Sequence, residues 1–196
     1  MFDYHAHIGV PTDNAIVCTS KPGEEVMLQP FRHRSIGLLP PYTEGLDRIE
    51  EYAEMGYAVG EIGLDRRFGD KEKQIEVFRK ALEIAVRHHS LITIHCVGWL
   101  DVMLSLLSQY RPECFIFHSF TSSPEVAREI QRLGGYISLS PQSMKSKHFL
   151  SVIESIAPFL IETDMPTGPK QEQVLSGLYE YLCITLDRTL SFPAIV

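Results

Sequence analysis

Histidine and carboxylate side chains occur at the carboxyl ends of several short apolar segments of this chain. His5 and His7 lie in the segment DYHAH, and their i, i+2 spacing on an extended backbone places both imidazoles on the same side. Four further residues stand at or just after later apolar segments: Glu61, His95, His118 and Asp164. Four imidazoles and two carboxylates are enough to bind two divalent metal ions, so the pattern predicts a metal centre.

Any one of these six residues has an ordinary structural interpretation. A single histidine at the end of a strand is more often a core or surface residue than a metal ligand. A metal centre therefore requires all six residues to come together in space, which depends on the elements that carry them.

The apolar segments alternate with amphipathic stretches, a pattern typical of a parallel sheet with crossover helices. We predict strands over residues 2–4, 15–19, 35–39, 58–62, 91–95, 114–118, 136–139 and 159–162. Eight such strands suggest a closed barrel. The carboxyl ends of the strands of a parallel barrel form one mouth, so the six residues, scattered from position 5 to position 164, would converge there.

The first two connections between the strands are too short or too broken for a full outer helix. The first is HIGVPTDN, and the second, KPGEEVMLQPFRHR, is interrupted at Pro22 and Pro30. A complete eightfold barrel usually needs roughly 250 residues, and this chain has 196. We expect an α/β fold with one domain over residues 1–196: a TIM-type (β/α) barrel of eight strands, reduced because the first two outer helices are missing or very short.

The composition indicates an ordinary globular protein, with 44% hydrophobic and 22% charged residues. A net charge of −7 argues against a broad basic face that follows a phosphate backbone. The start, MFDYHAHIGV, lacks the features of a secretion signal, and no window approaches the ~20 apolar residues of a membrane span. The four cysteines form no CxxC pair, which fits reduced thiols. We expect a cytoplasmic protein that does not bind membranes.

The segments DYHAH, GEIGLD, IHC, FHSF and ETDMP, with Gln74 in the helix after the second, resemble the TatD-like metal-dependent hydrolases in order and spacing. The resemblance covers nearly the whole chain and implies an amidohydrolase-like TIM barrel, often with deoxyribonuclease activity. An HxH start alone would also suit other amidohydrolases or the PHP phosphoesterases, but the latter usually close on Asp-x-His, which ETDMPT lacks. In the family pattern one metal is bound by His5, His7 and Asp164, the other by His95 and His118, and Glu61 bridges them.

This ligand set suits hydrolysis by a metal-bound hydroxide, because a divalent ion lowers the pKa of water from about 16 to about 7. The hydroxide would attack a phosphoester, which would be DNA in a deoxyribonuclease, or another small ester or amide. Asp164 would accept or deliver the proton, and Glu61 would act between the two ions. One or two divalent ions are implied. Imidazole-rich ligation favours Zn, Mn or Fe, while the resemblance keeps Mg among the candidates.

The chain departs from the family pattern where substrate would bind. Family members usually have Gly-x-His-Pro after the third strand, and here the segment is Gly37-Leu38-Leu39-Pro40. A basic residue commonly follows the fifth-strand histidine, and here Cys96-Val97-Gly98-Trp99 follows it. We therefore expect weak, strongly salt-sensitive activity on DNA and better turnover of a small phosphoester or ester. The alternative is a metal-retaining barrel that has little catalysis and acts as a binding or partner module.

Three polar residues after GEIGL have two interpretations each. Arg66 and Arg67 could face an anionic substrate or be a solvated loop pair. Asp65 could orient a metal ligand or cap the loop. The sequence leaves these alternatives open.

The helix-poor flank between residues 8 and 34 is expected to carry exposed apolar side chains: Val26, Met27, Leu28 and Phe31. A monomer rarely leaves a large apolar patch uncovered, so we expect a homodimer through this flank.

Overall fold

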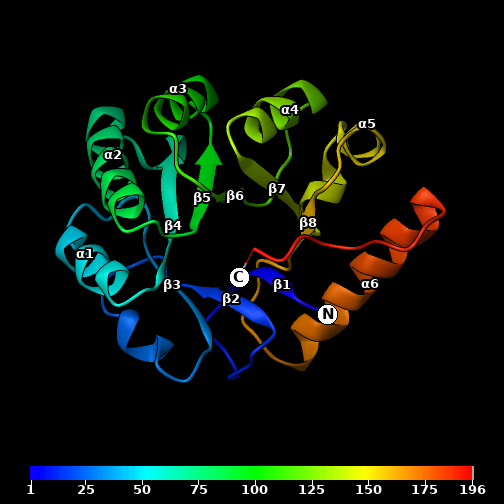
Figure 1. Ribbon diagram of the computed structural model, residues 1–196, viewed down its shortest axis with the longest axis horizontal. Coiled ribbons are helices and arrows are strands. Elements are labelled where there is room, and N and C mark those ends of the chain that lie inside the picture. The colour runs from blue at the N-terminus through cyan, green and yellow to red at the C-terminus, as the bar shows by residue number, and fades with distance from the viewer. Residues whose placement is uncertain (196) are drawn as a thin grey trace.

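The computed structural model describes residues 1–195 as eight parallel strands paired in sequence order, with helices around the outside (Figure 1). The strands are β1 (Asp3–His7), β2 (Ala15–Cys18), β3 (His33–Leu38), β4 (Ala58–Asp65), β5 (Ile92–Val97), β6 (Phe115–Phe117), β7 (Gly135–Leu139) and β8 (Leu160–Ile161). The α-helices are α1 (Leu46–Glu54), α2 (Lys71–Arg87), α3 (Leu100–Tyr110), α4 (Pro124–Arg132), α5 (Phe149–Ser155) and α6 (Pro169–Leu186). The predicted eight-stranded TIM-type barrel is confirmed.

The barrel closes between β1 and the segment that follows β8. The backbone N–H of Asp164 donates to the carbonyl of His5 at 3.1 Å, and the N–H of His7 donates to the carbonyl of Met165 at 2.9 Å. The N–H of Thr167 then donates to the carbonyl of His7 at 3.1 Å. These backbone contacts bring the two ends of the barrel sequence together and place Asp164 beside the β1 histidines.

The side of the barrel around β1, β2 and β3 lacks full outer helices, as predicted. Residues 8–14, all of them described, contain no helix, and the β2–β3 connection contains only a single 3-10 turn, η1 (Glu25–Leu28). In Figure 1 the blue loops and the η1 turn cover this side of the barrel, whereas α1 to α6 line the rest of the circumference.

The expected apolar flank is only half correct. Val26 and Met27 are exposed, but the prediction was wrong for Leu28 and Phe31, which are buried. Both pack in a small cluster against apolar residues of β1 and β2, because the η1 turn lies against the barrel wall in place of a helix. The exposed apolar area is therefore smaller than expected, and the homodimer stays a prediction.

The main core lies between the strands and the outer helices. Helix α2 begins at the cap residue Asp70, whose carboxylate accepts from the N–H of Lys73, and it buries Phe78, Leu82 and Ala85 against the sheet. Fully burying a side chain such as Phe78 contributes roughly 1.5–3 kcal/mol to stability. Among residues 1–195, no helix combines the length and the apolarity needed to cross a bilayer.

Strands β4 and β5 come so close at Gly63 that a side chain has no room. An ideal Cβ on Gly63 would lie 1.8 Å from the carbonyl oxygen of His95. Because that oxygen belongs to the backbone, a change of rotamer cannot relieve the contact. The glycine therefore determines how closely the two strands that carry Glu61 and His95 approach each other.

We expect Gly63→Ala to destabilise the protein by about 3 kcal/mol or more, since overpacking against backbone forces the strands apart. Gly177→Ala is the control, because a Cβ there meets nothing within 4 Å and the residue lies within α6. Alanine in a helix is favoured over glycine by about 1 kcal/mol, so the control should be as stable as the unsubstituted protein or slightly more so. Thermal unfolding of the two variants checks this, and equal melting temperatures would contradict it.

Candidate metal centre

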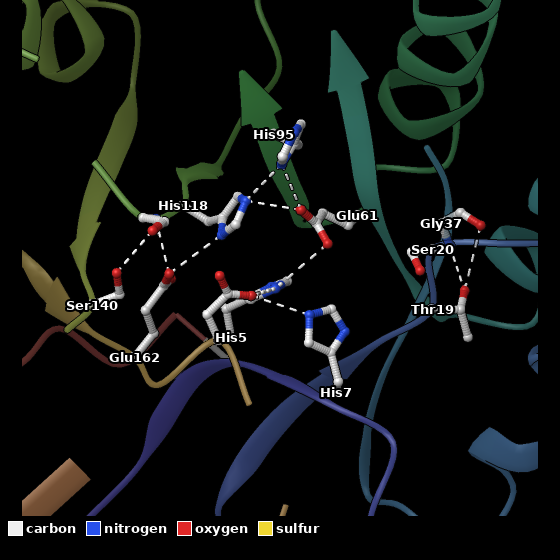
Figure 2. A network of polar contacts seen from close by, with 12 residues as sticks. His5, His7, Thr19, Ser20, Gly37, Glu61, His95, His118, Ser140 and Glu162 are labelled. Atoms are coloured by element: carbon white, nitrogen blue, oxygen red, sulfur yellow. Dashed lines mark hydrogen bonds and ion pairs between the residues drawn. The ribbon is translucent and has the colours of Figure 1, made fainter. Parts of the chain in front are cut away.

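The six predicted ligands lie together at the carboxyl ends of the strands. Figure 2 labels five of them: His5, His7, Glu61, His95 and His118. His5 and His7 lie in β1, Glu61 in β4 and His95 in β5, while His118 directly follows β6 and Asp164 follows β8. Their potential ligand atoms form three groups, each within 4.8 Å: His5, His7 and Glu61; His5, His118 and Asp164; Glu61, His95 and His118. The structure thus brings together every residue that the sequence pattern selected for the centre.

Glu61 stands between the two sets of imidazoles. Its Oε1 lies 2.8 Å from Nε2 of His118 and 2.9 Å from Nδ1 of His95, whereas Oε2 faces Nε2 of His5 at 3.6 Å. Burial alone would raise the pKa of the Glu61 carboxyl, but the charge and hydrogen bond of His118 and the hydrogen bond of His95 hold it well below its usual range. Glu61 is therefore an ionised carboxylate with one oxygen directed to each side of the site.

The position of Glu61 depends on a glycine of the neighbouring strand. An ideal Cβ on Gly37 of β3 would lie 2.1 Å from the backbone nitrogen of Glu61. The N–H of Gly37 donates to Oγ1 of Thr19 at 2.7 Å, which attaches β3 to the end of β2 (Figure 2). The close approach of β3 and β4 at this level is what allows the Glu61 side chain to enter the mouth of the barrel.

Asp164 lies on the solvent side of the centre. Its Oδ1 is 3.1 Å from Nε2 of His7 and 3.5 Å from Nε2 of His5, and its side chain is 36% exposed. Partial burial would raise the pKa of Asp164, but the adjacent imidazoles of His5 and His7 lower it below the usual range of an aspartate. The residue is thus ionised, fixed by two imidazoles and still accessible to water.

Two further carboxylates orient the second pair of histidines. Nε2 of His95 lies 3.2 Å from Oδ2 of Asp65, and Nδ1 of His118 lies 3.3 Å from Oε1 of Glu162. An acid on the far nitrogen of an imidazole fixes the ring orientation and leaves the other nitrogen free for a metal. The other two nitrogens, Nδ1 of His95 and Nε2 of His118, face Glu61 and lie 3.1 Å from each other.

Asp65 makes the contacts that both of the interpretations left open by the sequence require. Besides its contact with His95, it accepts from the backbone N–H and the side chain of Arg67 and so caps the short turn η2 (Arg66–Phe68). Burial raises the pKa of Asp65, but the hydrogen bonds from Arg67 and His95 outweigh it and lower the pKa to about 2. Arg67 is thus committed to Asp65, and its guanidinium lies at the edge of the site.

Sequence reasoning missed Glu162, although it is the last residue of a predicted strand. Its side chain is fully buried and accepts from the backbone N–H of Ser119 at 2.8 Å and from the hydroxyl of Ser138. An acid at an inward position of an otherwise apolar strand was the available signal, because such a residue is almost never buried without partners.

Asp3 anchors the two chain segments that carry His5 and Asp164. Its Oδ2 accepts from the hydroxyl of Thr163 at 2.6 Å and from the amide of Gln171 in α6 at 2.5 Å. Its Oδ1 accepts from the backbone N–H groups of His5 and Thr163. Burial raises the pKa of Asp3 to about 6 in spite of these bonds. Asp3 therefore positions ligands rather than facing the centre itself.

The buried imidazole of His5 provides the test of whether a metal fits. Its side chain is completely buried, and neither ring nitrogen forms a hydrogen bond with a described residue. A buried polar group without a partner costs about 1–3 kcal/mol, and a metal ion near Nε2 would remove this cost. The donor set around it, imidazoles and ionised carboxylates, is the set that divalent transition metals prefer.

The electrostatics of the protein alone agree with this. Burial would lower the pKa of His118, but the charge of Glu61 raises it to about 10. The negative charge of Glu61 thus favours a protonated His118. A bound metal cation would supply the same positive charge at this place.

Solved structures that resemble this fold include those of two TatD proteins. YjjV of Escherichia coli, a TatD homologue, superposes with a TM-score of 0.79 at 22% identity and covers 94% of this chain and 89% of its own. A TatD family hydrolase from Entamoeba histolytica superposes with a TM-score of 0.65 at 24% identity over 84% of this chain and 64% of its own. At these identities the likeness concerns the fold.

Curated relatives share more of the sequence. Human deoxyribonuclease TATDN3 is 29% identical over 154 residues, which are 74% of this chain and 56% of that protein. The uncharacterized metal-dependent hydrolase YabD of Bacillus subtilis is 29% identical over 208 residues, 85% of this chain and 80% of its own. This chain spans about half the length of several curated relatives that it matches. The family model described as TatD related DNase matches residues 30–181, which is most of the chain. The chain therefore belongs to the TatD-related DNase family.

Proposed function

We propose that this protein is a divalent-metal-dependent phosphoester hydrolase that holds two ions at the barrel mouth. His5, His7 and Asp164 would hold one ion, His95 and His118 the other, and Glu61 both. The observation that carries the proposal is the Glu61 carboxylate, whose two oxygens face different imidazoles at 2.8, 2.9 and 3.6 Å. Bound ions of this kind lower the pKa of water and polarise a phosphoryl oxygen.

The chain's own residues divide the remaining work. Asp164 is ionised and solvent-accessible, so it is placed to accept the proton of the attacking water. His7 holds the Asp164 carboxylate in position at 3.1 Å. Asp65 and Glu162 keep the imidazoles of the other side in a fixed orientation, so that little reorganisation accompanies the reaction.

The donor set bears on which ion is bound. Four imidazoles make the site softer than an all-oxygen site, which favours Zn, Mn or Fe over Mg. Mg nevertheless belongs among the metals to be tested, because each ion would also meet a carboxylate: Glu61 would serve both ions, and Asp164 would serve the one held by His5 and His7.

A small phosphoester is the proposed substrate, with DNA as the competing one. The net charge of −7 repels a polyanion, and the residue after His95 is Cys96, whose thiol donates to the carbonyl of Gly98. Burial raises the pKa of this thiol to about 12, so it supplies neither a positive charge nor a nucleophile. Several relatives carry the name deoxyribonuclease, so DNA is the natural comparison.

Removing the metal should abolish hydrolysis. We expect chelation followed by dialysis to lower the turnover of a small aryl phosphate by about 1000-fold or more, because Lewis-acid stabilisation of the transition state is worth several kcal/mol. Adding back Zn or Mn should restore it. The measurement is a panel of a phosphomonoester, a phosphodiester, a carboxylester and single-stranded DNA, each with Zn, Mn and Mg.

Two outcomes of this panel would count against the proposal. A protein that binds metal in stoichiometric amounts but turns over no member of the panel would support the alternative of a binding or partner module. Digestion of single-stranded DNA at physiological salt that is faster than hydrolysis of any small phosphoester would show that the assignment of a small substrate is wrong.

A further inference from the structure

A pocket of about 230 Å³ opens directly beside the metal centre, on the side of His95. Besides His95, its lining includes Leu39, Pro40, Tyr42, Arg67 and Phe68, and we call it the aromatic pocket. Because the pocket adjoins the centre, one part of a substrate can occupy it while another part of the same molecule reacts at the centre. No role in binding or orienting the ions falls to Tyr42 or Phe68.

Two large aromatic side chains on this pocket are left in water. Tyr42 is 43% exposed and Phe68 is 50% exposed. They come from separate loops, Tyr42 from the β3–α1 connection and Phe68 from the η2 turn after β4. Aromatic rings gain strongly from burial, and two of them on one pocket form a surface suited to a flat apolar group.

The loop that carries Phe68 is held rigidly against the metal centre. Oε1 of Gln74 accepts from the N–H of Asp65 at 2.8 Å, and the Gln74 amide donates to the carbonyl of Gly69 at 2.5 Å, so one side chain braces both ends of the turn. Asp65 contacts both Arg67 and His95. The turn that carries the aromatic ring is therefore fixed relative to His95, and a supported loop of this kind suits recognition of a substrate group.

The opposite side of the centre has a different chemical character. The pocket of about 400 Å³ beside His118 is lined by Ser119, Thr121, Ser122 and Lys147, together with the buried rings of Phe117 and Phe120. Residues with hydroxyl groups are thus concentrated on this side, whereas Tyr42 and Phe68 expose their rings on the other. A flat apolar group is therefore better matched by the aromatic pocket than by this one.

We infer that the aromatic pocket binds a planar aromatic group of the substrate, such as a nucleobase, carried by the same molecule as the phosphoester that reacts at the metal centre. The inference rests on the proposed function and adds a substrate class to it: a small nucleotide. The guanidinium of Arg67, whose carbon lies 6.0 Å from the Phe68 ring centre, extends the flat surface at the rim. A cavity of about 230 Å³ accepts one ring system and not a stretch of polynucleotide.

The test uses Tyr42→Leu and Phe68→Leu, which keep an apolar side chain but remove the ring. The control is Tyr181→Leu, since Tyr181 is 40% exposed and lies in α6, which contributes no residue to this pocket. The substrates are a deoxynucleoside monophosphate and its abasic analogue with the same sugar phosphate. For the base-bearing substrate we expect KM to rise about tenfold in each test variant, since base–aromatic stacking is worth this much, while kcat, metal content and the abasic substrate are unaffected.

A second measurement separates this inference from the proposed function. Binding of the free deoxynucleoside, which has no phosphate to hydrolyse, is followed by saturation-transfer NMR on the unsubstituted protein and on the three variants. Nucleoside binding that is lost in Tyr42→Leu and Phe68→Leu but kept in Tyr181→Leu supports the pocket even if no phosphoester is turned over. Hydrolysis without preference for the base-bearing substrate, or an equal loss on the abasic substrate, would overturn the inference and leave the proposed function in place.

Discussion

Replacing Glu61 with glutamine is expected to remove metal and hydrolysis together. The carboxylate has one oxygen near His95 and His118 and the other facing His5, so it is the group that both sides of the centre share. The amide keeps the shape but loses the negative charge, and its NH2 group cannot act as a ligand on one of the two sides. We expect metal affinity to fall by more than the 10–100-fold that typically follows loss of an outer-shell partner. Hydrolysis should fall by about 1000-fold or more.

Elemental analysis of the purified variant and steady-state kinetics measure the two effects. Glu113→Gln is the matched control, because Glu113 is an exposed acid that contacts a histidine, His89, outside the centre. The control should retain both metal and activity. A Glu61→Gln protein with unchanged metal stoichiometry would remove the bridging role from this residue.

Replacing Asp164 with asparagine is expected to separate hydrolysis from metal binding. Hydrolysis should fall by about 100- to 10,000-fold, the usual contribution of a positioned general base. The ion held by His95, His118 and Glu61 should remain, because Asp164 belongs to a different group of potential ligands. The variant should therefore contain at least one metal ion per chain and be almost inactive, unlike Glu61→Gln.

The control for this substitution must have the same backbone conformation as Asp164. Asp164 has a φ of 56°, in the left-handed region that asparagine also tolerates. Asp187, at the end of α6, has a φ of 48° and lies outside the centre, so Asp187→Asn repeats the chemical change in the same backbone conformation. If Asp164→Asn keeps activity within about twofold of the control, the proton of the attacking water has another acceptor.

Most of the fold was predictable, but the ends of its elements were not. The segment after residue 57 was assigned a strand over 58–62, whereas β4 continues to Asp65, because it pairs with β5 as far as Asp65 and Val97. Glycines and an acid make GEIGLD look like a loop, and only the neighbouring strand keeps it extended. For the same reason His5 and His7 lie within β1 rather than beyond it.

The residues that hold the predicted ligands in position were harder to predict from the sequence. Asp65 had two alternative interpretations, and the structure shows the contacts of both: it caps η2 and lies against His95. Glu162 and Gln171 were not singled out as supporting residues. Glu162 contacts His118 directly, and Gln171 donates to Asp3, which positions His5. Such partners are separated by tens of residues or more in the chain, so no local spacing reveals them.

By itself, the sequence determined which side chains meet at the barrel mouth. An alternation of strands and helices makes the strands parallel, and parallel strands bring all their carboxyl ends to one face, so the positions of six residues along the chain were sufficient. Only the tertiary structure decided the contacts that depend on loop conformation. These include the burial of Leu28 and Phe31 and the meeting of Tyr42 with Phe68 at one pocket. The physical reason is that the path of a loop is set by packing and hydrogen bonds to distant segments, which periodicity does not encode.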